Sequence, residues 1–129
     1  MKLVTFLGET MSNSAATSES TSITEQVFRH HLGAFALGID ELLKDYTDGS
    51  VIITPTATHA GLNQIRAFFE AFLASTTPEF WAAFQVESQA VKDEVAYLTW
   101  SAAPFIPMAT DTLVIRGARI AIQTFTPFQ

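Results

Sequence analysis

One aspartate stands apart from the other acidic residues because of the segment that contains it. Asp111 opens an alternating apolar segment, and if Leu113 and Ile115 face the interior, a period of two places the Asp111 carboxyl on the same face. A carboxyl in an apolar pocket has a raised pKa, because burial disfavours its charged form. Such a group can abstract a proton near neutral pH or, while neutral, donate a hydrogen bond. The alternative is a solvated turn residue that follows the loop at residues 104–109.

Histidines supply the other candidates for acid–base chemistry. His30 and His31 are consecutive on a predicted helix, so their directions differ by about 100° and only one can face the interior. A cavity-facing His31 could polarise a carbonyl or move a proton, and the competing interpretation is a partly exposed histidine. His59 lies in a predicted loop, near the expected mouth of a cavity. The spacing of the three supports no metal site, so we expect neither a metal nor another cofactor.

Aromatic residues are the most abundant candidates for ligand contact, since the chain has 11 phenylalanines. A cavity bounded by aromatic rings would suit a flat, hydrophobic small molecule. The competing interpretation is that these rings form ordinary core. The candidate lining residues are Phe35, Phe68, Phe69, Phe72, Phe84, Trp100 and Phe105.

Length, charge and cysteine content limit the classes of protein that could hold these groups. A chain of 129 residues forms one domain that buries roughly two-thirds of its unfolded surface. The absence of cysteine excludes disulfides, thiol catalysis and cysteine-bound metals. A net charge of −6 argues against nucleic acid and anionic membranes as partners. No apolar stretch approaches the roughly 20 residues of a membrane span, and no secretory signal is evident, so we expect a cytoplasmic protein.

Two amphipathic helices are predicted from apolar residues that recur at steps of three and four. Ser22 and Glu25 have the spacing of a capping box, and the apolar stripe that follows continues to about residue 46. Gly38 should bend or interrupt this helix. The second helix covers about residues 62–74.

Alternation and β-branched residues predict the strands. A charged turn at residues 92–94 joins two of them, whereas the two prolines of residues 104–108 predict a loop or an edge crossing. The predicted strands are residues 50–54, 84–91, 95–103, 110–116 and 119–125. On the first strand of the central hairpin, alternation places Phe84, Val86, Ser88 and Ala90 on one face and Gln85, Glu87, Gln89 and Val91 on the other.

Helices followed by an antiparallel sheet define an α+β protein. The strand at 95–103 is apolar on both faces, with Ala96, Leu98 and Trp100 on one and Val95, Tyr97 and Thr99 on the other. One face should pack on the helices and the outer face on a second copy of the chain. We therefore expect a homodimer through the outer sheet face.

The amino-terminal segment is predicted to be a flexible tail covering residues 1–22, and the domain covers 23–129. Residues 12–22 are almost entirely Ser, Thr and Ala, so they bury too little surface to repay their ordering entropy. An alternative is that residues 3–7 add an edge strand to a neighbour.

Several local phrases in this order resemble the nuclear transport factor 2-like superfamily, including its SnoaL-like polyketide cyclase and ketosteroid isomerase branches. The resemblance covers about residues 23–127. The phrases are Ile39-Asp40-Glu41-Leu42-Leu43, Asp45-Tyr46-Thr47-Asp48, Val51-Ile52-Ile53-Thr54-Pro55, Gly61 with Gln64-Ile65-Arg66-Ala67-Phe68-Phe69, and Asp111-Thr112-Leu113 with Arg116-Gly117. The resemblance implies a cystatin-like cone, in which a curved antiparallel sheet wraps around helices and encloses an apolar cavity, and it implies dimers through the outer face.

The same resemblance implies roles for individual residues. Asp111 matches an oxyanion-stabilising acid in the isomerase branch and an acidic proton acceptor in the cyclase branch. His31 matches an oxyanion-hole tyrosine, and Tyr46 matches a tyrosine inside the pocket. Thr54 stands where the isomerase branch has its catalytic aspartate, and Phe69 stands where it has a supporting tyrosine. Because a threonine hydroxyl is no base near pH 7, steroid isomerisation by that mechanism is disfavoured.

Two functions follow as hypotheses. The first is a SnoaL-like enzyme that acts on a hydrophobic carbonyl compound by proton transfer through Asp111, with His31 or His59 assisting, in an isomerisation, cyclisation or dehydration. The second is a non-catalytic module for binding a hydrophobic ligand or for dimerisation, which the missing acid at Thr54 favours.

Overall fold

The structure is a computed structural model that describes residues 15–129. Helices come first and most of the sheet follows, which confirms the α+β class. The helices are α1 (Ala15–Ala34), α2 (Ile39–Leu43), α3 (Leu62–Ser75) and α4 (Pro78–Ala83). The strands are β1 (Val51–Ile53), β2 (Thr58–Ala60), β3 (Gln85–Lys92), β4 (Val95–Ala102), β5 (Ile106–Arg116) and β6 (Arg119–Phe128).

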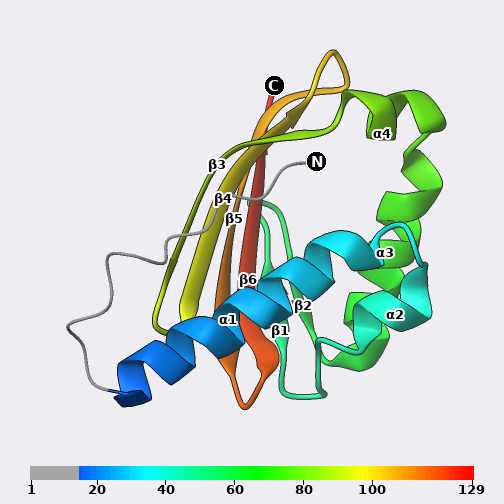
Figure 1. The fold of residues 1–129 in the computed structure, drawn as a ribbon. Helices are drawn as coiled ribbons and strands as arrows, with labels where there is room; N and C mark the ends of the chain where they lie inside the picture. Colours follow the sequence, from blue (N-terminus) through cyan, green and yellow to red (C-terminus); the bar gives the residue numbers. More distant parts are fainter. Residues whose placement is uncertain (1–14) are drawn as a thin grey trace.

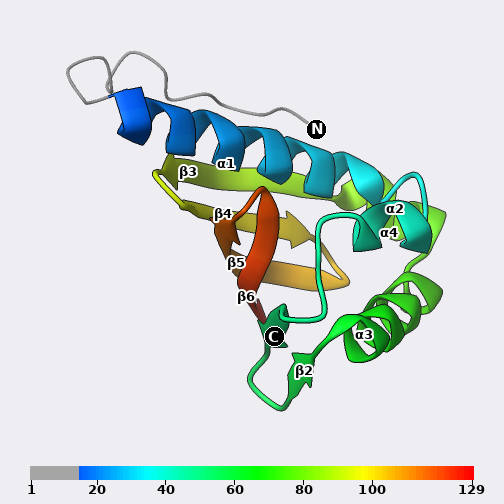
Figure 2. The same ribbon diagram turned by 90° about the horizontal axis from the view of Figure 1, so that it is seen from below.

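The six strands form one curved sheet in the order β2-β1-β6-β5-β4-β3. Every neighbouring pair is antiparallel except β1 and β6, so the sheet is mixed where a fully antiparallel one was expected. The parallel pair is possible because a long connection, here about half of the chain, separates β1 from β6. The helices lie together on one side of the sheet (Figures 1 and 2). Helix α1 runs across the strands, and α3 and α4 lie on the right in Figure 1.

The first helix begins earlier than the sequence predicts. It starts at Ala15, so the predicted cap at Ser22 lies inside the helix, and residues 15–22 are helical where a flexible segment was expected. The Asp93 N–H donates to Thr21 Oγ1 at 3.1 Å, and Thr24 Oγ1 donates to the Asp93 carbonyl. Docking on the β3–β4 turn thus stabilises a segment that composition alone predicts to be disordered. The predictions for residues 1–14, including the alternative edge strand, lie outside the described residues.

The break in the apolar stripe falls where glycine predicts it. Between α1 and α2, Gly38 has φ +105°, a conformation that other residues rarely adopt. This turn sends α2 away from the axis of α1, so Tyr46 can return towards the sheet, where it is buried. The interruption predicted at Gly38 is confirmed.

Two short elements were not predicted. Strand β2 forms a hairpin with β1, and α4 begins at Pro78, which the sequence pattern treats as the end of the preceding helix. Thr77 caps α4, because its Oγ1 accepts the Phe80 N–H at 3.1 Å, and Pro78 occupies the first turn, where no N–H partner is needed. Trp81 lies on this unpredicted helix.

A bulge corrects the predicted faces of β3. The pairing with β4 shifts between Val86 and Ser88. As a result, Gln89 and Val91 lie on the same inner face of the sheet as Val86. Strict alternation placed Val86 and Val91 on opposite faces and is therefore wrong for this strand. On β5, pairing begins at Ile106, inside the segment predicted as a loop.

The two faces of β4 differ as predicted. Ala96, Leu98 and Trp100 are buried against the helices, whereas Val95 and Tyr97 on the opposite face are each 39 % exposed. The outer face therefore presents apolar side chains to its surroundings. Among residues 15–129, no helix has both the length and the apolar character that crossing a bilayer requires.

Candidate active site

A cavity of about 400 Å³ lies between the helices and the inner face of the sheet. Its wall is built by α1 and the turn after it, by α3 and α4, and by β4, β5 and β6. The sequence-predicted aromatic residues that line it are Phe35, Phe68, Phe69, Phe72, Phe84 and Trp100. A hollow bounded by rings is therefore present where the aromatic residues of the sequence predict one.

The rings of the wall pack on one another in edge-to-face and tilted contacts. Phe35 meets Phe69 and Phe72 at centroid distances of 5.8 and 6.0 Å, with interplanar angles of 75° and 71°. Trp81, on α4, packs on Phe35 at 5.6 Å and on Phe84 at 5.7 Å. Such pairs stabilise by about 1 kcal/mol beyond the area that they bury, so the wall is a cooperative cluster.

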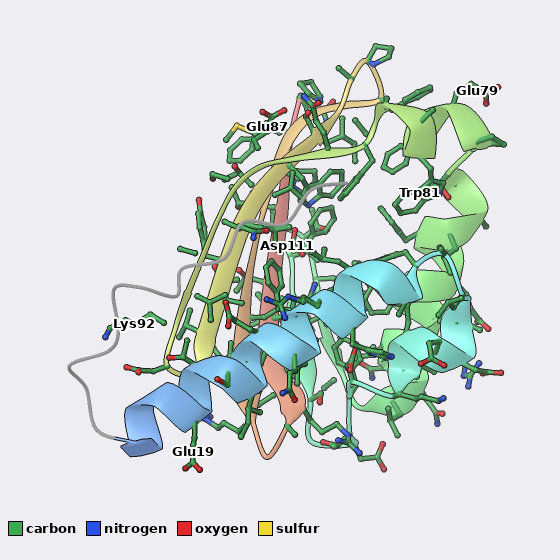
Figure 3. All side chains as sticks on the ribbon, viewed as in Figure 1. Glu19, Glu79, Trp81, Glu87, Lys92 and Asp111 are labelled. Carbon is green, nitrogen blue, oxygen red and sulfur yellow. The ribbon has the colours of Figure 1, made fainter. Side chains whose placement is uncertain are left out.

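Asp111 lies on the inner face of β5 and is only 7 % exposed. Its Oδ1 accepts a hydrogen bond from Trp100 Nε1, and its Oδ2 accepts one from Gln123 Nε2, both at 2.9 Å. Burial raises the pKa of Asp111 from 3.8 to about 6, although the two hydrogen bonds act in the opposite direction. The side chain lies between the sheet and the helices, with Trp81 on the opposite wall (Figure 3).

The hydrogen-bond chain continues from Gln123 to Tyr46. The Tyr46 hydroxyl donates to Gln123 Oε1, which leaves the amide nitrogen of Gln123 to face Asp111. Burial, and then the negative charge of Asp111, raise the pKa of Tyr46 well above its ordinary value, so its hydroxyl keeps its proton and remains a donor. This chain fixes the orientation of the Gln123 amide and, through it, the surroundings of the carboxylate.

His31 lies on α1, lines the same cavity and is buried. Burial lowers its pKa to about 3, and the neighbouring charge of His30 adds to this effect, so the imidazole is neutral near pH 7. It contacts Phe35 edge-to-face at 5.2 Å, and its Nδ1 has no hydrogen-bond partner among the described residues. A neutral imidazole has one N–H and one lone pair, so it can donate to a ligand oxygen.

His30 points away from the cavity, as the helical geometry requires. Its Nε2 lies 2.7 Å from Glu41 and its Nδ1 lies 2.7 Å from Asp45. Hydrogen bonds to Glu41 and then to Asp45 raise the pKa of His30 above 6.5. The Ile120 N–H donates to the Asp45 carbonyl at 2.7 Å, so this ionic cluster connects α1 and the end of α2 to β6.

The other predicted site residues lie elsewhere. His59, on β2, packs against Phe68 at 4.8 Å and does not line the cavity. Thr54 belongs to a surface turn, where its Oγ1 accepts the Ala57 N–H at 3.2 Å. Phe105 is about half exposed and lines a separate, open pocket between α4 and β6. Tyr46 reaches Asp111 only through Gln123.

Three aromatic or polar residues of the cavity wall were not predicted to line it: Trp81, Gln123 and Phe125. Gln123 and Phe125 could have been found from the alternation of β6, because a single polar side chain in step with inward-facing residues suggests a buried hydrogen bond. Trp81 had no such signal, since α4 itself was not predicted. No three His, Asp or Glu side chains within residues 15–129 converge to hold a metal ion.

Comparison with known proteins supports the fold. No family model matches the sequence, and no curated protein matches it. Among solved structures, the chain is similar to a SnoaL-like protein of unknown function from Burkholderia thailandensis, with a TM-score of 0.65 and 15% identity over 84% of this chain and 96% of that one.

Two further structures agree with this result. An NTF2-like protein of unknown function from Mesorhizobium loti has a TM-score of 0.67 and 19% identity over 84% of this chain and 93% of its own. A proposed polyketide cyclase from Sinorhizobium meliloti has a TM-score of 0.63 and 19% identity over 78% of this chain and 93% of its own. The chain therefore has the fold of the SnoaL-like and nuclear transport factor 2-like proteins, as the sequence resemblance implied.

Proposed function

We propose that the protein is a small-molecule enzyme of the SnoaL-like type that transfers a proton next to the carbonyl group of a hydrophobic compound. The observation that carries the proposal is the Asp111 carboxylate, held by two N–H donors inside an aromatic cavity. The indole of Trp100 and the amide nitrogen of Gln123 can donate but not accept, so both stabilise the ionised form. This favours Asp111 as a base over Asp111 as a neutral hydrogen-bond donor.

The chemistry would proceed by a balanced proton transfer. A carboxylate oxygen of Asp111 takes the proton from the carbon beside the carbonyl, the electron pair of that C–H bond forms a C=C bond, and the π electron pair of the carbonyl moves onto its oxygen. The neutral His31 donates a hydrogen bond to the resulting enolate oxygen. Asp111, now protonated, returns the proton to a different carbon, which gives isomerisation. The same enolate can instead expel a β-hydroxyl group, which takes the proton from Asp111 and leaves as water, or attack a second carbonyl, whose oxygen takes that proton.

The raised pKa of Asp111 supports this role. A base with a pKa of about 6 is mostly ionised at pH 7 yet holds a proton more firmly than an ordinary aspartate. The similarity in fold to a proposed polyketide cyclase is compatible with such chemistry. The proposal gives no step to His59, because that side chain lies behind Phe68.

The test is turnover of a panel of hydrophobic β,γ-unsaturated and β-hydroxy ketones. Asp111→Asn should abolish turnover while circular dichroism and thermal unfolding show a folded protein. The control is Asp40→Asn, since Asp40 is an exposed carboxyl on α2. Turnover that survives in Asp111→Asn at the wild-type rate rejects Asp111 as the base.

A second candidate function is a non-catalytic module that binds a hydrophobic ligand. It is favoured by the position of Thr54 in a surface turn and by the fact that Asp111 and His31 are the only titratable side chains among the described residues of the cavity wall. Native mass spectrometry of the purified protein distinguishes the two, because a module retains an unaltered ligand, whereas an enzyme converts it.

We also propose that the outer sheet face joins two copies of the chain. Val95 and Tyr97 are exposed there, and Thr99 and Thr110 pair beside them on the same face. Sedimentation velocity should show a dimer that Tyr97→Lys dissociates. A wild-type monomer at all concentrations contradicts the proposal.

A further inference from the structure

The cavity contains a carboxylate but no opposite charge. No lysine or arginine is present among the described residues that line it, and the one imidazole, His31, is neutral near pH 7. Buried charges in proteins are normally paired with an opposite charge, because leaving water is costly. Asp111 receives two hydrogen bonds, but both come from uncharged groups. Its negative charge is therefore uncompensated within the described wall.

The carboxylate also has room for further donors. Two carboxylate oxygens offer about four acceptor sites. Trp100 Nε1 takes one site on Oδ1, and Gln123 Nε2 takes one on Oδ2. About one acceptor site on each oxygen thus remains, and Asp111 lines the cavity. An ammonium group supplies N–H donors and the missing positive charge together.

The rest of the wall is also suited to a cation. The face of an aromatic ring carries a partial negative charge that attracts ammonium groups. Trp100 and Phe125 lie nearly parallel, with an interplanar angle of 4° and centroids 6.0 Å apart, and Phe84 packs on Trp100 at 5.1 Å. Trp100 itself donates to Asp111, so ring surface and carboxylate are adjacent. The net charge of −6 also attracts cations from a distance.

From this arrangement we propose that the cavity binds hydrophobic amines in their protonated form, with the ammonium group on Asp111 and the apolar part among the aromatic rings. This ligand class goes beyond the proposed carbonyl substrate, and its binding requires no turnover. An amine would compete with a carbonyl substrate for the same carboxylate. Organic acids are excluded, since their charge would face Asp111 without a cation between them.

The experiment compares three naphthalene compounds of similar shape and different charge. They are 1-naphthylmethylamine, 1-naphthylmethanol and 1-naphthoate, titrated calorimetrically into the full-length protein at pH 7.5. We expect the amine to bind about tenfold or more tightly than the alcohol, which is the range for a hydrogen bond to a charged group, and we expect no binding of the acid. Equal affinities for the amine and the alcohol would overturn the proposal.

Two variants assign the preference to a residue. Asp111→Asn should bind the alcohol and the amine with similar affinity, because the charge is gone and the rings remain. Asp40→Asn removes an exposed carboxyl of the same type and should keep the wild-type preference. A preference that persists in Asp111→Asn overturns the assignment to Asp111.

A measurement on the wild type alone keeps the test independent of how the variant folds. The preference for the amine should fall between pH 7.5 and pH 5, as Asp111 takes up a proton. The titratable groups facing Asp111 are His31 from α1 and Tyr46 from the segment after α2, and both stay neutral over this range. A preference that does not change with pH contradicts the proposal. Turnover of a neutral ketone is measured separately, so failure of amine binding leaves the proposed reaction untouched.

Discussion

Replacing Asp111 by asparagine should change how the stability of the protein depends on pH. Burial raises the pKa of Asp111 from 3.8 to about 6 in the folded protein. A group whose pKa is raised on folding stabilises the folded state below its unfolded pKa, and this contribution is lost as the pH rises through the folded pKa. The wild type should therefore lose stability from this group as the solution becomes less acidic.

The magnitude follows from the two pKa values. The difference between 3.8 and about 6 corresponds to about 3 kcal/mol in total, of which about 2 kcal/mol falls between pH 4.5 and pH 7.5. The asparagine side chain of the variant does not titrate, and its imperfect match to the donors on Trp100 and Gln123 costs the same at both pH values. Relative to the wild type, Asp111→Asn should thus gain about 2 kcal/mol of unfolding free energy between pH 4.5 and pH 7.5.

Urea unfolding followed by tryptophan fluorescence at the two pH values measures this difference. Asp40→Asn is the matched control, because the Asp40 side chain is 87 % exposed, and its difference from the wild type should stay nearly constant. The reasoning is refuted if the difference between Asp111→Asn and the wild type does not change with pH, or if it changes with the opposite sign.

Three other perturbations test separate parts of the structure. Gln123→Leu removes an N–H donor from Asp111, so the pKa of Asp111 should rise above about 6 and the loss of stability should move to higher pH; an unchanged pH midpoint would contradict the hydrogen bond. The pKa of His30 is raised on folding, so its stabilising contribution is present below pH 6.5 and lost as the pH rises through the higher folded value. The loss of stability of His30→Gln relative to the wild type should therefore become smaller between pH 6 and pH 9. A loss that becomes larger would contradict a raised pKa for His30. In thermal unfolding, Gly38→Ala should cost about 1–3 kcal/mol because of its positive φ, whereas Gly33→Ala, in an uncrowded helical position, should stabilise by about 0.5–1 kcal/mol; effects of the same sign would contradict this.

The elements that follow from local pattern could be predicted from the sequence. The second helix, expected over residues 62–74, is α3 at Leu62–Ser75, and the break at Gly38 is present. Of the two interpretations left open for Asp111, the structure shows the one that alternation offers, because Asp111 and Leu113 are both buried. These predictions succeeded because a single periodicity governs each segment.

The errors occur where a distant contact or a local irregularity decides the structure. The bulge in β3 depends on its pairing with β4, and no residue of β3 signals it. The early start of α1 depends on the contacts of Thr21 and Thr24 with Asp93, about 70 positions further along the chain. The partnership of Tyr46, Gln123 and Asp111 likewise exists only once α2, β6 and β5 are assembled.

The adjacent histidines of α1 have one more consequence. His30, outside the cavity, is held between two carboxyls, whereas the next residue, His31, lies inside the cavity and is uncharged near pH 7. If α1 turned about its axis by one residue, His30 would move among the phenyl rings, away from the carboxyls of Glu41 and Asp45. The rotation of α1 about its own axis therefore determines which imidazole lines the cavity: the neutral one of His31, or the one of His30 that is hydrogen-bonded to two carboxyls.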